Sequence, residues 1–198
     1  ELIKLVNRLE PELTPEQKVQ RQTVIEIVKQ ACTECLGKIA NLHLLGSERL
    51  GVSTADSDLD AVCEIPNYLS GEAFLKNVEQ HLQGLCDFTQ LVTDARVPLL
   101  RLQLEKITVD LLYAQVADTQ VESEPRNSIL KDETRNRIKP DSPSFKAIVG
   151  CWEADAIAQT VEKYIPLSSF ILLLRAVRAW AKSRCLYSNT YGFLGGFS

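Results

Sequence analysis

Two apolar segments of this chain carry aspartates at positions that a β-strand would bury. Asp58-Leu59-Asp60 runs from a polar turn into Ala61-Val62-Cys63, and Asp110 lies within the apolar residues 107–113. Successive side chains on a strand point to opposite faces, so Asp58 and Asp60 share one face. Carboxylates this close repel one another, burial strengthens the repulsion, and a divalent cation between them removes both costs. Three such aspartates on adjacent strands of one small sheet predict a two-metal site.

A calcium loop or an ion pair in the core could also account for these aspartates. Counted from Asp56, an EF-hand loop would place Ala61 where glycine makes the sharp turn, and Asn67 where a glutamate binds through both oxygens. Neither residue suits its position, so the EF-hand is excluded. An arginine such as Arg101 on the neighbouring strand would also keep Asp110 buried, and for Asp110 alone this alternative stays open.

Periodicity and turn residues predict an α+β fold with a small mixed sheet. Thr14 begins a helix with a capping box and Gly37 ends it, while Ser70 caps a second helix that stops at Gly84. Glu105-Lys106 is short enough to join two strands as a hairpin. The expected strands cover residues 39–45, 58–65, 97–104 and 107–114.

The second part of the chain is predicted to be helical. Residues 118–142 are polar, carry Pro125 and Pro140, and indicate a linker. The pattern from Ser144 onward is helical, with a strongly apolar helix over residues 167–185. We therefore expect one domain over residues 1–120 and a truncated helical segment over 121–198. Because the chain starts without Met, we expect it to be a piece of a longer protein.

Charge and cysteine content narrow the class of protein. A net charge of -4 argues against a chain that coats nucleic acid through bulk positive charge. No apolar run is long enough to span a bilayer, so no membrane association is expected. Among six cysteines, Cys32 and Cys35 form the only CxxC, without a second pair or nearby His for zinc. We expect reduced, buried thiols in a nuclear or cytoplasmic protein.

The Gly46-Ser47 pair, just ahead of the first two aspartates, adds a phosphate-binding element. A strand that ends in Gly-Ser before a helical turn leaves backbone N–H groups and a hydroxyl available to phosphate oxygens. The dipeptide alone carries no weight. Followed by Asp58 and Asp60 and by a later strand aspartate, it is the pattern of the polymerase-β-like nucleotidyltransferases.

Two blocks of the chain together resemble the eukaryotic poly(A) polymerase family. The first runs from Gly46-Ser47 through Arg49-Leu50-Gly51-Val52 to Asp58-Leu59-Asp60, with the third acid in Val109-Asp110-Leu111-Leu112-Tyr113. The second is similar to that family's central-domain nucleotide-binding segment and comprises Leu174-Arg175-Ala176, Trp180-Ala181-Lys182, Tyr187-Ser188-Asn189 and Gly192 to Gly196.

The resemblance implies a palm-type catalytic domain followed by the start of a helical central domain. Asp58, Asp60 and Asp110 would hold two Mg²⁺ or Mn²⁺ ions. The nucleotide would be bound by Gly46, Ser47, Arg178, Lys182, Tyr187 and Gly196. The implied partners are ATP or another nucleoside triphosphate and an RNA 3′ end, and the family's C-terminal RNA-binding region would be missing from this chain.

The second block also has a basic helix face of its own. Arg175, Arg178 and Lys182 share one side of the predicted helix, and Leu173, Val177 and Trp180 lie on another. A solvated basic surface would explain the cations if they stood alone. With a metal–triphosphate site expected opposite, a phosphate-binding face explains them better.

The sequence departs from the family pattern at a few positions. Val149 stands where the family has Asn, Arg178 where it has Lys, and Leu45 where it has an aromatic residue. Val149 in particular weakens the expectation that adenine is the base. Asp56 is interpreted as a turn residue. The two histidines, His43 and His81, are interpreted as packed or surface residues and not as catalytic groups.

The leading hypothesis is a metal-dependent, template-independent transferase that adds AMP from ATP to an RNA 3′ end. The first alternative is related chemistry with another product, namely UMP transfer, CCA addition or oligoadenylate synthesis. The second is an inactive nucleotide- or RNA-binding protein that has kept the fold. The presence of all three aspartates argues against the inactive form.

Overall fold

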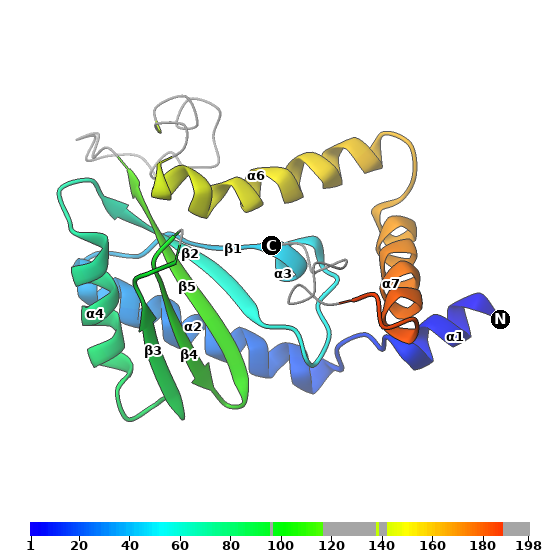
Figure 1. Cartoon of the computed structure of the whole chain (residues 1–198), viewed down its shortest axis with the longest axis horizontal. Helices are drawn as coiled ribbons and strands as arrows, with labels where there is room; N and C mark the ends of the chain where they lie inside the picture. The colour runs from blue at the N-terminus through cyan, green and yellow to red at the C-terminus, as the bar shows by residue number, and fades with distance from the viewer. Residues whose placement is uncertain (96, 117–137, 139–141, 188–198) are drawn as a thin grey trace.

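A computed structural model describes residues 1–95, 97–116, 138 and 142–187 of the chain. A mixed five-stranded sheet forms the centre, in the order β1-β2-β5-β4-β3, and helices cover both of its faces (Figure 1). The strands are β1 (Leu42–Leu44), β2 (Leu59–Pro66), β3 (Phe88–Val92), β4 (Leu99–Leu104) and β5 (Ile107–Val116). The α+β fold class predicted from the sequence is confirmed.

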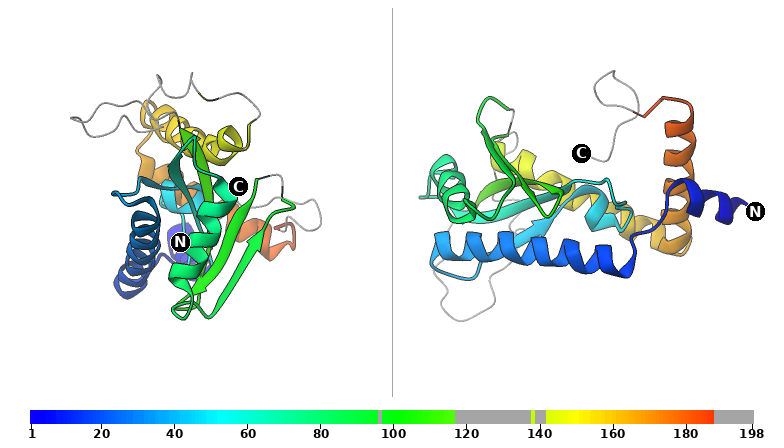
Figure 2. Two further views of the ribbon diagram at one scale, coloured as in Figure 1. Left: turned by 90° about the vertical axis from the view of Figure 1, so that its left-hand side faces the viewer. Right: turned by 90° about the horizontal axis from the view of Figure 1, so that it is seen from below.

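The helices frame this sheet and extend to one side of it. They are α1 (Leu2–Leu9), α2 (Pro15–Leu36), α3 (Gly46–Leu50), α4 (Gly71–Leu82), α6 (Pro143–Glu162) and α7 (Leu167–Ser183). The long helix α2 runs along the sheet, and α1 and α7 lie together beyond its end (Figures 1 and 2). The first and last described helices are therefore neighbours.

Strand alternation divides the apolar side chains between two cores. On one face, Leu59, Ala61 and Cys63 of β2 join the core formed with α2 and α4. On the opposite face, Val62 and residues of β5 pack against Ile148 and neighbours in α6. The sheet is thus a middle layer, and the acid-bearing side of β2 is the side that faces α6.

Local capping signals explain where several helices begin and end. Thr14 and Gln17 form the predicted capping box at the start of α2, with bonds of 2.9 and 3.2 Å. Gly37 closes α2 in the left-handed conformation at φ 63°. Ser70 caps α4 through the backbone N–H of Ala73. These boundaries were predictable because each depends on residues close in sequence.

The β4–β5 hairpin is also confirmed, with both turn residues in the left-handed region. Glu105 has φ 50° and Lys106 has φ 68°, as a type I′ turn requires. The structure differs from the prediction in four places. The strand expected over residues 39–45 is only Leu42–Leu44, and the half-exposed strand β3 and the helix α1 were not predicted. Helix α4 ends at Leu82, with Gln83 as its C-cap, and not at Gly84.

Most of the predicted linker over residues 118–142 lies outside the described residues. So does the boundary near residue 120, which stays a prediction.

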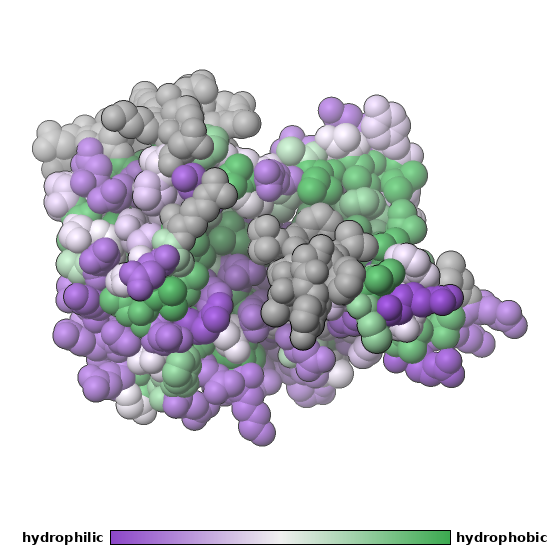
Figure 3. Space-filling view, in the orientation of Figure 1, coloured by the Kyte–Doolittle hydropathy of each residue, from purple (hydrophilic) through white to green (hydrophobic). Residues whose placement is uncertain are grey.

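Exposed apolar residues gather on α7, where Figure 3 shows a hydrophobic area. Leu173, Val177 and Trp180 are each about half exposed, and they form the apolar side of α7 that the sequence predicts. No single described helix is long and apolar enough to cross a membrane. The helices α6 and α7, bent by 117° relative to each other, meet that criterion only as a pair, by length and composition.

A close approach between α4 and β5 makes Gly71 a sensitive position. A Cβ atom at Gly71 would overlap the aromatic ring of Tyr113, which is itself buried. We expect Gly71→Ala to lower the free energy of unfolding by about 1–3 kcal/mol, because the ring has to move within a packed core. Urea denaturation measures this. In a Tyr113→Val background, Gly71→Ala should lower the free energy of unfolding much less than it does in wild type. An equal cost in the two backgrounds would contradict the contact.

Candidate active site

Three charged residues form a row across the middle of the sheet. Asp60 on β2 pairs in parallel register with Asp110 on β5, and Asp110 pairs in antiparallel register with Arg101 on β4. Register partners point to the same face of a sheet, so all three side chains lie on the α6 side. Two of the three predicted metal ligands are therefore neighbours, as the sequence led us to expect.

Arg101 holds Asp110 through both carboxylate oxygens. Its Nε donates to Oδ1 at 2.7 Å and its Nη2 donates to Oδ2 at 2.6 Å. Asp110 is 9% exposed, whereas the arginine side chain is 45% exposed. The structure thus contains the ion pair with Arg101 that the sequence left open as an alternative explanation for Asp110. A bidentate arginine supplies a cation to a buried carboxylate, but this one lies at the solvent side of the row.

Asp60 has a strongly perturbed acidity. Burial, then the neighbouring carboxylates of Asp110 and Asp58, raise its pKa from 3.8 to about 6. Arg101 acts in the opposite direction and lowers that pKa. The acids thus crowd one another even with one arginine beside them, which is the electrostatic setting that favours an additional cation.

Asp58 lies just before β2 and is exposed, while Asp56 lies in the preceding turn, also exposed. The position of Asp56 agrees with its interpretation as a turn residue. Backbone and hydroxyl bonds between Thr54 and Ser57 close this turn, at 3.1 Å for N–H to carbonyl. The loop therefore has a fixed shape ahead of the strand that carries Asp60.

Arg21, which was not predicted from the sequence, attaches helix α2 to the loop that carries the aspartates. This α2 side chain is 3% exposed and donates to the carbonyls of Ser57 and Asp58, at 2.8 and 3.3 Å. Its Nε also donates to Glu48 Oε2 at 2.9 Å, in α3. One buried guanidinium thus ties α2 to both the aspartate loop and α3. The only sequence signal was an arginine on the apolar side of a helix.

Gly46 and Ser47 begin α3 directly after β1, in the strand–turn arrangement predicted for them. Gly46 has φ 52°, a left-handed value that glycine adopts without strain. The N–H of Leu45, just before it, donates to the carbonyl of Asp60 at 2.8 Å. The Gly-Ser turn is therefore attached to the strand that carries the acid.

A cavity of about 540 Å³ opens over this region. It is lined by residues of the Gly-Ser turn, the acidic row and α6, namely Leu45, Gly46, Leu50, Asp60, Leu99, Asp110, Leu112, Lys146, Ala147, Val149, Gly150, Glu153, Ala154 and Ile157. Val149 and Leu45, two of the departures from the family pattern, thus face the same space as the aspartates.

The turn is joined to α6 by a second bidentate ion pair. Arg49 donates from Nε to Asp155 Oδ1 at 2.7 Å and from Nη2 to Oδ2 at 2.8 Å. It also donates to the carbonyl of Leu44 at 3.3 Å, so β1, α3 and α6 meet at one side chain. The pair fixes the helix that forms the upper wall of the cavity relative to the Gly-Ser turn.

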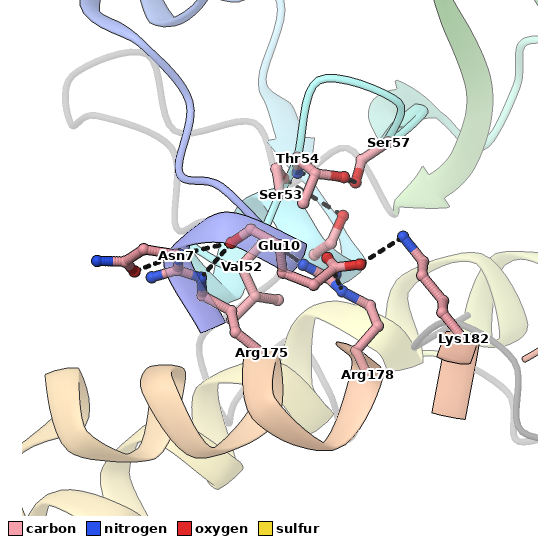
Figure 4. Close-up of polar contacts among 10 residues, drawn as sticks. Asn7, Glu10, Val52, Ser53, Thr54, Ser57, Arg175, Arg178 and Lys182 are labelled. Atoms are coloured by element: carbon pink, nitrogen blue, oxygen red, sulfur yellow. Dashed lines mark hydrogen bonds and ion pairs between the residues drawn. The ribbon is translucent and has the colours of Figure 1, made fainter. Parts of the chain in front are cut away.

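The predicted phosphate-binding residues Arg178 and Lys182 of α7 lie against the N-terminal segment (Figure 4). Arg178 Nε and Lys182 Nζ donate to the two carboxylate oxygens of Glu10, at 2.8 and 2.7 Å. Arg178 also donates to the carbonyl of Val52, at 2.8 Å, in the loop after α3. Tyr187 lies beside Lys182, whose Nζ is 5.6 Å from the ring centroid. Gly196 lies outside the described residues.

The donor set fits a hard divalent cation in kind, since Mg²⁺ and Mn²⁺ prefer carboxylate oxygens. Among the described residues, however, no three acidic, His or Cys side chains converge as they would around a bound ion. In this structure Arg101 donates to both oxygens of Asp110, and each of those oxygens keeps a second lone pair for a cation.

The remaining histidine and cysteine predictions agree with the structure in most respects. His43 is packed, with Nε2 2.7 Å from Glu64 Oε1, and His81 is a surface residue near Cys35. All six cysteines are free. Buried thiols were expected, but Cys35 and Cys86 are only partly buried and Cys185 is exposed. Burial raises the pKa of the Cys35 and Cys151 thiols to about 11, which keeps them protonated.

Comparison with known proteins gives one family. The profile of the poly(A) polymerase nucleotidyltransferase domain matches residues 17–161. A poly(A) polymerase of Dictyostelium discoideum is 32% identical over 162 residues, which is 81% of this chain and 19% of that protein. Nuclear poly(A) polymerase 1 of Arabidopsis thaliana is 33% identical over 165 residues, 80% of this chain and 22% of that protein. The chain thus spans about a fifth of the length of these relatives.

Solved structures of more distant proteins align with part of the chain. The RNA terminal uridylyl transferase Cid1 aligns with a TM-score of 0.49 and 13% identity, over 56% of this chain and 36% of that one. The non-canonical poly(A) polymerase GLD-2 in complex with GLD-3 aligns with a TM-score of 0.47 and 20% identity, over 57% and 39%.

The raised pKa of Asp60 predicts a pH-dependent stability. Between pH 3.8 and about 6 the folded state keeps a proton that the unfolded state has released, so the free energy of unfolding falls as pH rises through this window. Without divalent metal, Asp60→Asn should therefore be more stable than wild type at pH 7, by about 1–2 kcal/mol allowing for solvent screening. The difference should vanish near pH 4, as measured by urea denaturation in EDTA.

The exposed turn variant Asp56→Asn is the matched control, and we expect it to change stability by less than about 0.5 kcal/mol at either pH. An Asp60→Asn protein that is less stable at pH 7, or whose effect does not depend on pH, would contradict the electrostatic crowding.

Proposed function

The chain belongs to the poly(A) polymerase family, and from this we propose that it is the catalytic part of a template-independent RNA nucleotidyltransferase. The proposed reaction is transfer of AMP from ATP to an RNA 3′ end. A bond forms between the 3′ oxygen and the α-phosphorus of ATP, and pyrophosphate leaves. The chain covers only part of its relatives, so the substrate and activity are proposals for the complete protein.

One observation carries the proposal: Asp60 and Asp110 lie in register beside the Gly-Ser turn, within the segment that matches the family. The cavity of about 540 Å³ places these acids and Gly46 on the walls of one space. A cavity that combines acidic residues with a turn suited to phosphate is what a metal–nucleotide substrate requires.

We propose the following roles for the site residues. Asp58, Asp60 and Asp110 hold Mg²⁺ or Mn²⁺, and Gly46 and Ser47 hold phosphate oxygens through a backbone N–H and a hydroxyl. Arg178 and Lys182 supply positive charge to the triphosphate, and Tyr187 and Gly196 contact the sugar or base. The three carboxylates would hold the divalent ions, whose chemistry when bound would be to activate the attacking 3′-hydroxyl and to stabilise the leaving oxygens.

The division into domains and the cellular location are also proposals. We propose a palm domain over residues 1–120 followed by a helical central-domain segment. The free thiols support a nuclear or cytoplasmic location, since disulfides are rare in reducing compartments.

One observation, the residue at position 149, favours products other than a poly(A) tail. Val149, in place of a family Asn, presents an apolar side chain to the cavity and cannot hydrogen-bond a base or sugar. UMP transfer, CCA addition and oligoadenylate synthesis therefore remain alternatives to polyadenylation. An inactive nucleotide-binding protein is the alternative without turnover.

Removal of two carboxylates tests the chemistry. The double variant Asp58→Ala/Asp60→Ala should lose primer extension by about a thousandfold or more, because the divalent ions lose their ligands. Extension of a labelled RNA primer with Mg²⁺ or Mn²⁺ measures this, and circular dichroism checks the fold. Asp56→Ala is the matched control, and we expect it to retain activity within about twofold. A double variant that still extends the primer would disprove the mechanism.

A panel of the four labelled nucleoside triphosphates tests the base. We expect the full-length protein to incorporate ATP in preference to the other three, and Val149→Asn to increase that preference by restoring a polar side chain in the cavity. Preference for UTP, or for CTP followed by ATP, would select the alternative products. Binding of nucleotide without any product would select the inactive form.

A further inference from the structure

Glu10 is a buried acid that no step described above uses. It is the residue after α1, only 2% exposed, and its carboxylate lies between two cations of α7. Oε2 accepts from Arg178 Nε at 2.8 Å, and Oε1 accepts from Lys182 Nζ at 2.7 Å. Figure 4 shows the carboxylate between the two side chains. A buried carboxylate that is paired on both oxygens has its rotamer and its neighbours fixed.

Contacts other than this carboxylate also hold the N-terminal segment against α7. Arg175, which is 4% exposed, donates to the backbone carbonyl of Glu10 and to Asn7 Oδ1 at 2.9 Å. It also donates to Glu12 Oε1 at 2.6 Å, and Val6 of α1 is buried. The segment is thus anchored to α7 through Arg175 and apolar packing. The side chain of Glu10 can therefore have a task apart from anchoring.

We relate the carboxylate of Glu10 to its two cations, Arg178 and Lys182, and to the loop that Arg178 contacts. Arg178 Nη2 donates to the carbonyl of Val52 at 2.8 Å, and the N–H of Val52 donates to the carbonyl of Ser47 at 2.9 Å. Arg178 therefore reaches the loop that follows the Gly-Ser turn. Lys182, four residues further along α7, remains 43% exposed.

Two cations one helical turn apart repel each other, and both side chains lose rotamer freedom when they bind a ligand. A carboxylate placed between them offsets the repulsion and fixes both rotamers before a ligand arrives, which lowers the entropic cost of binding. Lysine has three N–H donors, and Glu10 accepts from Nζ at only one of its oxygens, so the ammonium can still donate to a phosphate.

We propose that Glu10 is a positioning residue that presets Arg178 and Lys182 for the phosphates of the incoming nucleotide. The inference rests on the proposed function, since it takes a nucleoside triphosphate as the ligand. It adds a residue from the N-terminal segment to a site otherwise built from the Gly-Ser turn, the acidic row and α7.

The test measures nucleotide affinity separately from turnover in the full chain. A fluorescent ATP analogue with Mg²⁺, displaced by ATP or by inorganic tripolyphosphate, gives affinities without RNA, and primer extension gives kcat and KM. We expect Glu10→Ala to weaken both ATP and tripolyphosphate about three- to tenfold, because two side chains are no longer immobilised. KM for ATP should rise by the same factor, with kcat within about twofold of wild type.

The conservative variant Glu10→Gln should lie between wild type and Glu10→Ala, because one amide oxygen still accepts from one of the cations while the NH₂ cannot. In a Lys182→Ala background, Glu10→Ala should have a smaller effect than in wild type, as expected of a residue that acts through its partners. The matched control is Glu12→Gln, which removes the charge of an exposed partner of Arg175 and should leave both affinities unchanged.

Four outcomes would overturn the inference. Unchanged affinity in a folded Glu10→Ala protein shows that the carboxylate does not position the pair. Tighter binding shows that it competes with phosphate for the two cations. Equal effects of Glu10→Ala with and without Lys182 show a purely structural role. A wild-type protein that binds no nucleoside triphosphate overturns the proposed function itself, and this inference with it.

Discussion

The parallel pairing of β2 with β5 is the constraint on which the candidate site depends. A shift by one residue would turn Asp60 away from Asp110 and into the apolar core beneath the sheet. The register is held by that core, because Leu59 and Ala61 of β2 and Val109 and Leu111 of β5 must face α2 and α4. The hydrophobic effect thus fixes the distance between two like charges that would otherwise separate. The acidic site follows from packing on the opposite face.

Local features of the fold could be predicted from the sequence, and long-range ones could not. The capping box at Thr14 and the left-handed Gly37 depend on neighbouring residues, so their positions are readable. Helix α1 is amphipathic and was overlooked, and β3 is a half-exposed edge strand with little alternation to identify it. The contacts made by Arg21 and Glu10 depend on partners far along the chain, so no local pattern predicts them. For the same reason the acids could be named from the sequence while the residues that hold them were missed.

Both halves of the candidate site are partly neutralised by the protein. On the sheet, Arg101 pairs with Asp110, and on α7, Glu10 pairs with Arg178 and Lys182. Each partner resembles in charge the ligand proposed for that half, a cation for the acids and an anion for the bases. Unpaired buried charges cost several kcal/mol, so such partners keep the ligand-free fold stable. They differ in exposure, since Arg101 is close to solvent and Glu10 is not.

The contact between α1 and α7 also affects the order in which the chain folds. Arg175 and Glu10 are 165 residues apart in sequence, and Arg178 and Glu10 are 168 apart. During synthesis the N-terminal segment is made first, but its partners are made only after the whole sheet and α6. The α2–sheet core can form in the meantime from shorter-range contacts, which form faster. The segment that carries Glu10 therefore docks only after α7 has been made, when the residues of the whole sheet and of α6 are already synthesised.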